Sequence, residues 1–139
     1  VAAIAKPSNG SGFDDGYDYG YRLWAAKFYP EAQNQLTEVV DKYPKNARIS
    51  FAKNLLGRAY LDDGQPAKAV KVLYANYKDD PKGARAPESL FYTGWALTDL
   101  DKAPEACGAF KALATTYPAE ATGRLADRLK EGRARAKCK

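Results

Sequence analysis

The sequence predicts an all-α fold, a solenoid of three helix pairs followed by a C-terminal capping helix. Several residues recur at a fixed step of 37 along the 139-residue chain. The recurring positions are Pro44, Pro81 and Pro118; Gly20, Gly57 and Gly94; Ala32, Ala69 and Ala106; and Leu36, Leu73 and Phe110. A fixed period in this range is typical of supersecondary units that bury their apolar faces only against their neighbours. No stretch alternates apolar and polar residues between turn signals, so we expect no strand.

Each unit divides into two helices at a turn marked by proline. Gly64-Gln65-Pro66 indicates the end of one helix and the start of the next, because Gly suits the position after a helix and Pro suits a first turn. Pro30 and Pro104 lie at nearly the same place in the other units. We expect first helices over about 14–28, 47–63 and 84–100, and second helices over about 30–43, 66–79 and 103–117. The chain then reads as a flexible N-terminal flank over 1–13 and one domain over 14–139, with repeats over about 14–46, 47–83 and 84–118 and a capping helix over about 119–136.

The recurring glycines predict a close helix crossing within each unit. Gly inside a helix costs about 1 kcal/mol relative to Ala, so a glycine that recurs in mid-helix needs a packing reason. We expect these glycines to let the two helices approach. The large apolar residue of each second helix, such as Leu36, is expected to fill the space beside them.

The C-terminal segment combines an apolar stripe with a basic face. Ala121, Leu125 and Leu129 recur at helical spacing, as expected of a cap that covers the last repeat. The net charge of +5 is concentrated here, and a basic surface can contact nucleic acid. Nucleic-acid binding is therefore an alternative function, although no aromatic residue for base stacking occurs after Tyr117. A solvated helix face is the simpler interpretation. No apolar run is long enough to span a membrane.

The composition argues against an enzyme. The chain has no histidine, which excludes Ser-His-Asp, Cys-His and histidine-containing zinc sites. Ser50 and Lys53 have the Ser-x-x-Lys spacing of penicillin-binding enzymes, but the companion motifs of that class are missing. The acidic residues between Asp14 and Asp18 lack the ligand pattern of a calcium-binding loop. We therefore expect no catalytic residue, metal or cofactor.

Cys107 and Cys138 are the only cysteines. They are either a disulfide of an oxidising compartment or two separate thiols. If the capping helix were continuous and antiparallel to the preceding helix, Cys138 would lie too far along it for a bridge. We predict a Cys107–Cys138 disulfide on the condition that the helix ends near Gly132 and the tail folds back.

The repeat pattern resembles the tetratricopeptide repeat. In the second unit, Leu56-Gly57, Tyr60, Ala69, Leu73 and Pro81 match the signature positions in order. This resemblance implies a right-handed superhelix whose first helices line a concave, peptide-binding surface. The resemblance places one set of residues from each unit in this groove. These are Asp14, Tyr17, Tyr21 and Trp24 of the first unit; Phe51, Asn54, Arg58 and Asp62 of the second; and Glu88, Phe91, Trp95 and Asp99 of the third. Aromatic and Arg residues dominate binding hot spots, and Asn54 is a candidate for holding a ligand's backbone amide. Any single aromatic among them is as readily explained by packing between helices.

Short sequence motifs within the repeats support a narrower resemblance. Asp41-Lys42-Tyr43-Pro44, and Glu105-Ala106-Cys107-Gly108-Ala109-Phe110 leading to Thr116-Tyr117-Pro118, look like the C-terminal domain of the Tol-Pal-associated cell division coordinator family (CpoB, formerly YbgF). The resemblance implies a non-catalytic module in the periplasm of a Gram-negative bacterium. Its partners would be TolA and peptidoglycan synthases, and its role would be to coordinate outer-membrane constriction with septal peptidoglycan synthesis. The alternative is an adaptor of another envelope assembly, such as outer-membrane protein insertion or a secretion complex.

Overall fold

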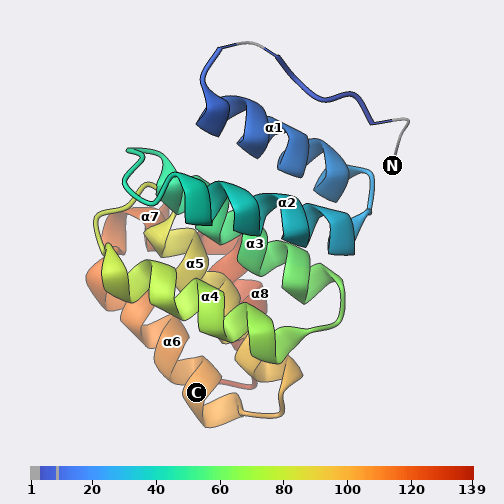
Figure 1. Ribbon diagram of the computed structural model, residues 1–139. Coiled ribbons are helices and arrows are strands. Elements are labelled where there is room, and N and C mark those ends of the chain that lie inside the picture. The colour runs from blue at the N-terminus through green and yellow to red at the C-terminus, as the bar shows by residue number, and fades with distance from the viewer. Residues whose placement is uncertain (1–3, 9) are drawn as a thin grey trace.

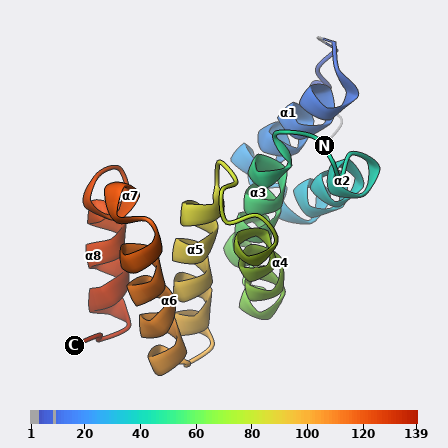
Figure 2. The ribbon, with the colours of Figure 1, turned by 90° about the vertical axis from the view of Figure 1, so that its left-hand side faces the viewer.

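The structure is a computed structural model that describes residues 4–8 and 10–139, and this part of the chain contains eight helices and no strand. The helices are α1 (Gly12–Ala25), α2 (Tyr29–Lys42), α3 (Ile49–Asp62), α4 (Pro66–Asp79), α5 (Ala86–Asp99), α6 (Ala103–Thr116), α7 (Pro118–Thr122) and α8 (Ala126–Arg135). Consecutive helices pack in pairs, and the pairs stack from α1–α2 to α5–α6 (Figure 1). Figure 2 shows α7 and α8 at the end of the stack farthest from α1. The predicted all-α solenoid of three helix pairs is confirmed.

The helix boundaries follow the 37-residue step. The first helices begin at 12, 49 and 86, and the second helices begin at 29, 66 and 103. All six lie within three residues of the predicted ranges. The turn between the two helices of each unit contains one residue with positive φ, Lys27 at 68°, Gly64 at 71° and Asp101 at 61°. The same turn is therefore built three times, once with the glycine that favours this conformation.

The glycine contacts explain the close crossing within each pair. A Cβ on Gly57 would lie 2.3 Å from the Leu73 side chain, and a Cβ on Gly94 would lie 2.5 Å from Phe110. Gly20 has the same relation to Leu36, at 2.6 Å. The large partners are fully buried. This confirms the predicted role of the recurring glycines.

Residues 4–6 lie against the first repeat. Ile4 packs on the cluster around Leu23, and Arg22 donates a hydrogen bond to the carbonyl oxygen of Ala5 at 3.1 Å. These residues belong to the segment predicted as a flexible flank, and α1 begins at Gly12, inside that segment. Residues 1–3 and 9 of the predicted flank lie outside the described residues.

The predicted single capping helix over 119–136 is divided in two. The short α7 occupies the place of the connections that precede α3 and α5, and α8 occupies the place of a fourth first helix. The chain bends at Gly123, where a Cβ would lie 2.8 Å from the carbonyl oxygen of Ala119. After this bend Leu125 and Leu129 pack into the core of the last repeat. No helix of the described residues combines the length and apolar character needed to cross a bilayer.

The predicted disulfide is present. Cys107 of α6 and Cys138 are bridged, with Cα atoms 5.6 Å apart. The condition set for it, a helix end near Gly132, is not met, because α8 continues past Gly132 to Arg135. Gly132 is instead a packing position, since a Cβ there would lie 2.7 Å from the Phe110 ring. The tail turns afterwards at Lys137, which has a φ of 58°.

Candidate functional site

A cleft of about 270 Å³ opens between α1 and α3 of the first two repeats. Six predicted groove residues line it, namely Tyr17, Tyr21, Trp24, Phe51, Asn54 and Arg58. Helical spacing of three or four residues places each set on one face of its helix. The remaining lining residues, Arg48, Leu55 and Arg85, were not predicted as groove residues.

Arg58 is held between two aromatic rings. Its guanidinium carbon lies 4.7 Å from the ring centroid of Trp24 and 4.7 Å from that of Tyr92. The indole of Trp24 in turn donates from Nε1 to Asp62 Oδ2 at 2.7 Å. Three successive first helices, α1, α3 and α5, thus contribute to one stack. Predicted residue Asp62 therefore orients Trp24, and Tyr92 is a site residue that the sequence reasoning missed.

The two missed arginines belong to a repeated contact between units. Asp14, Phe51 and Glu88 occupy equivalent positions, 37 residues apart, at the start of the first helices. Each is faced by an arginine from the segment that enters the next unit. The contacts are Arg48 with Asp14 at 2.6 Å, Arg85 over the Phe51 ring at 4.5 Å, and Arg124 with Glu88 at 2.9 Å.

A repeated sequence motif marks Arg48 and Arg85 as equivalent residues. Lys45-Asn46-Ala47-Arg48 returns as Lys82-Gly83-Ala84-Arg85, 37 residues later. This repetition alone indicates only a connection between units. The structure shows that the last residue of each motif also lines the cleft.

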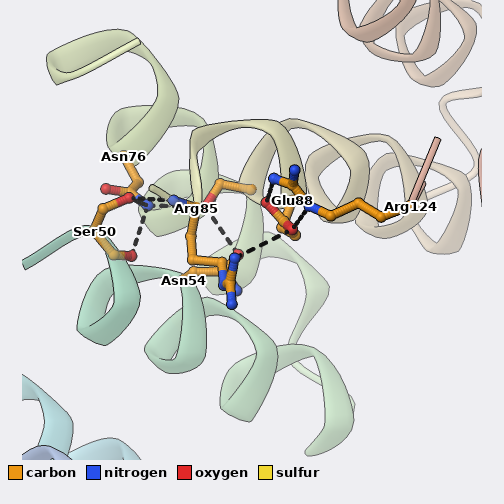
Figure 3. A network of polar contacts seen from close by, with 7 residues as sticks. Ser50, Asn54, Asn76, Arg85, Glu88 and Arg124 are labelled. Carbon is orange, nitrogen blue, oxygen red and sulfur yellow. Dashed lines mark hydrogen bonds and ion pairs between the residues drawn. The ribbon is translucent and has the colours of Figure 1, made fainter. Parts of the chain in front are cut away.

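A buried polar network lies beside the cleft, between the second and third repeats (Figure 3). Asn76 Nδ2 donates to the Ser50 carbonyl oxygen at 3.1 Å and to Ser89 Oγ at 2.9 Å. Ser89 Oγ donates to Asn54 Oδ1 at 2.9 Å, and the backbone N–H of Arg85 donates to Ser50 Oγ at 3.0 Å. Asn54 is buried, and its side-chain oxygen Oδ1 already accepts a hydrogen bond from Ser89. A fully bonded network of this kind fixes the spacing of the two repeats.

The predicted groove residues of the third repeat lie beneath the cap. Phe91 is 3% exposed and packs in the core, and Glu88 is 6% exposed and binds Arg124. Arg135 of α8 lies over the Trp95 ring at 4.5 Å and forms an ion pair with Asp99. A hollow of about 220 Å³, which Phe91, Tyr92 and Trp95 line with Arg128 and Glu131, remains between α5 and α8. The cap therefore separates the four predicted groove residues of the third repeat, Glu88, Phe91, Trp95 and Asp99, from the open cleft.

A larger hollow, of about 470 Å³, lies between α4 and α6. It exists because α6 carries small residues: a Cβ on Gly108 would meet no atom within 4 Å, and the equivalent position in α4 is Lys71. Its lining is mostly apolar, with Glu105 as its one charged residue, and it contains the half-exposed Tyr74. The α1–α3 cleft gathers three arginines among aromatics that are exposed, as Tyr21 is, or partly buried. These are the residue types of binding hot spots, so this cleft is the stronger candidate.

Comparison of the chain with known protein families and solved structures agrees with this architecture. The tetratricopeptide repeat model matches the chain over residues 17–84 and over residues 54–121. The second match begins 37 residues after the first, so both reflect the internal repeat. Curated proteins provide no match to this chain. A solved structure of nearly identical TPR-like repeats of a candidate kinesin light chain from Podosopora anserina is similar in fold, with a TM-score of 0.64 at 17% identity, covering 98% of this chain and 80% of that one. Because the family matches span most of the described helices, the chain belongs to the tetratricopeptide repeat family.

Proposed function

We propose that this chain is a non-catalytic protein-interaction module that holds a peptide segment of its partner in the α1–α3 cleft. Tetratricopeptide repeats suggest a protein–protein interaction module, and solenoids of this kind use their extended concave surfaces for binding. The observation that carries the proposal is the cleft itself, where aromatic and arginine side chains from two repeats meet in one open hollow.

The cleft is built to bind with little ordering cost. Tyr21 is 49% exposed and its ring centroid lies 5.7 Å from that of Trp24, so the two rings offer a continuous aromatic surface. Asp62 already holds Trp24, and Ser89 already holds Asn54. Side chains that are fixed before binding lose less conformational entropy when a ligand arrives, which favours affinity.

An array of immobilised random peptides tests the cleft, with Tyr74→Ala as the matched control for Tyr21→Ala. Both tyrosines are about half exposed, at 45% for Tyr74, but Tyr74 lies in the other hollow. We expect the wild type to bind a subset of peptides, Tyr21→Ala to lose them and Tyr74→Ala to keep them. If Tyr74→Ala alone loses binding, the site is the α4–α6 hollow and the proposed cleft is wrong.

We further propose that the chain acts in the periplasm of a Gram-negative bacterium and belongs to the Tol-Pal-associated cell division coordinator family. The Tyr-Pro motifs at the ends of the first and third repeats, Tyr43-Pro44 and Tyr117-Pro118, support this proposal. The Cys107–Cys138 bridge also supports it, because disulfides persist in oxidising compartments such as the periplasm. The chain would then link TolA to peptidoglycan synthases during division.

Affinity capture from periplasmic extract tests this narrower proposal. We expect the wild type to recover TolA or peptidoglycan synthases and Tyr21→Ala to recover less of either. Recovery of outer-membrane insertion or secretion components instead, with the same dependence on Tyr21, would place the module in another envelope assembly and overturn the Tol-Pal proposal.

A further inference from the structure

We infer that the α1–α3 cleft selects an acidic segment of the partner, and that Arg58 and Arg85 are the residues that read its carboxylates. The inference rests on the proposed peptide-binding function and adds the chemistry of the ligand. The side chains that line the cleft include three arginines and neither aspartate nor glutamate. A positively charged hollow with aromatic walls favours a ligand that carries carboxylates beside apolar side chains.

Of the three arginines that line the cleft, Arg58 is the one without an ion pair among the described residues. Within the described part of the chain, no carboxylate oxygen lies within the 4.0 Å of an ion pair with this guanidinium. Its contacts are instead the faces of Trp24 and Tyr92. Stacking uses the two faces of a guanidinium and leaves its in-plane N–H groups for a bidentate bond to a carboxylate. Arg58 is therefore both held in position and chemically available.

Arg85 is available for a different reason. Its Nη1 lies 3.5 Å from Glu88 Oε2, too far for a good hydrogen bond, and its guanidinium rests on Phe51. Glu88 is mostly buried and needs a cationic partner, but Arg124 already supplies two hydrogen bonds, at 2.9 and 3.3 Å (Figure 3). Arg85 can therefore turn to a ligand without leaving a buried carboxylate uncompensated.

Arg48, the third arginine of the cleft, is engaged within the protein. It lies 2.6 Å from Asp14 Oδ1, a distance typical of a charge-assisted hydrogen bond. We therefore assign it a smaller share of ligand recognition. The surroundings of Tyr17 agree with a positive cleft: burial raises the pKa of this phenol, while the positive charges of Arg85 and Arg48 act in the opposite direction.

The peptide array also tests this inference, now by the composition of the bound peptides. We expect enrichment in Asp and Glu, and loss of that enrichment in Arg58→Gln. For the best acidic peptide, fluorescence anisotropy should give an affinity about tenfold weaker for Arg58→Gln and for Arg85→Gln, the loss expected for one charge-assisted hydrogen bond. Lys71→Gln, which removes one positive charge from α4 outside the cleft, should bind like the wild type.

Wild-type measurements keep the inference testable even if an arginine variant unfolds. Affinity for the acidic peptide should fall as salt is raised, because screening weakens contacts between charges. Bound peptides without an excess of acidic residues would overturn the acidic selection and leave the peptide-binding function standing, whereas an array without bound peptides would overturn both. Binding of an oligo-dT strand that Arg58→Gln abolishes, without acidic peptide binding, would assign the cleft to nucleic acid instead.

Discussion

Gly57 of α3 and Leu73 of α4 are packed so closely that a Cβ on the glycine would lie 2.3 Å from the leucine Cγ. The missing side chain is therefore what brings the two helices of the second repeat together. Replacing Gly57 by Ala forces either Leu73 or the helix axis to move, and such overpacking typically costs about 1–3 kcal/mol.

We therefore expect Gly57→Ala to lower the free energy of unfolding by about 2 kcal/mol, measured by urea denaturation. Gly108→Ala is the matched control, because its Cβ would meet no atom within 4 Å in the middle of α6. That variant should gain about 0.5–1 kcal/mol from reduced backbone entropy in the unfolded chain. Equal effects of the two substitutions would contradict the packing role of Gly57.

The turn between paired helices predicts a second pair of stability changes. Lys27 and Asp101 have the same left-handed backbone as Gly64, a conformation that costs a residue with a side chain about 1 kcal/mol. Lys27→Gly and Asp101→Gly should each raise the unfolding free energy by about that amount, whereas Gly64→Ala should lower it. Lys27→Ala removes the same side chain and keeps a Cβ, so a gain in this control would show that the backbone is not the cause.

The Cys107–Cys138 bridge should stabilise the cap more than the rest of the stack. It joins residues 31 apart, and a loop of this size contributes about 4 kcal/mol in the chain-entropy account. The double variant Cys107→Ser/Cys138→Ser should unfold at lower urea, and amide exchange should accelerate in α8 before it does in α3. Two reactive thiols in the unfolded, unreduced wild type would show that the bridge is not formed.

Tyr117 predicts a loss of stability at high pH. Its hydroxyl donates to the Pro81 carbonyl oxygen at 2.5 Å. Burial first, and then nearby Tyr77, Glu120 and Asp80, raise the pKa of the phenol from 10.0 to about 12. The unfolded chain releases this proton at lower pH than the folded protein does. The contribution is therefore complete below about pH 10 and is lost as the pH rises toward 12.

We expect the melting temperature of Tyr117→Phe to fall less steeply than that of the wild type between these two pH values. At neutral pH the variant should be less stable by about 1 kcal/mol, the usual net value of one hydrogen bond. Tyr74→Phe, at a half-exposed position on α4, controls for removal of a tyrosine hydroxyl. A wild-type slope in Tyr117→Phe would exclude Tyr117 as the titrating group.

The period predicted the helices and the crossings because both depend on residues within one unit. Proline and glycine mark the turns locally, and the Gly57–Leu73 contact joins neighbours in the same pair. The burial of Phe91 and Glu88 depends instead on the C-terminal segment that packs on the third repeat. The bend at Gly123 lets α8 lie over α5 in the place of a fourth first helix, whereas the sequence analysis predicted one continuous capping helix. The period therefore located equivalent residues correctly but did not indicate which of them the cap would cover.

The equivalent positions Asp14, Phe51 and Glu88 show how such an array can diversify. An arginine faces each of them, and a guanidinium accepts either a carboxylate at its edge or an aromatic ring on its face. An exchange between acid and aromatic at this position therefore keeps the spacing of the units while it changes the charge that the groove presents. Ligand preference in this architecture can drift by single substitutions without a compensating change elsewhere, which leaves the scaffold free to acquire new partners one repeat at a time.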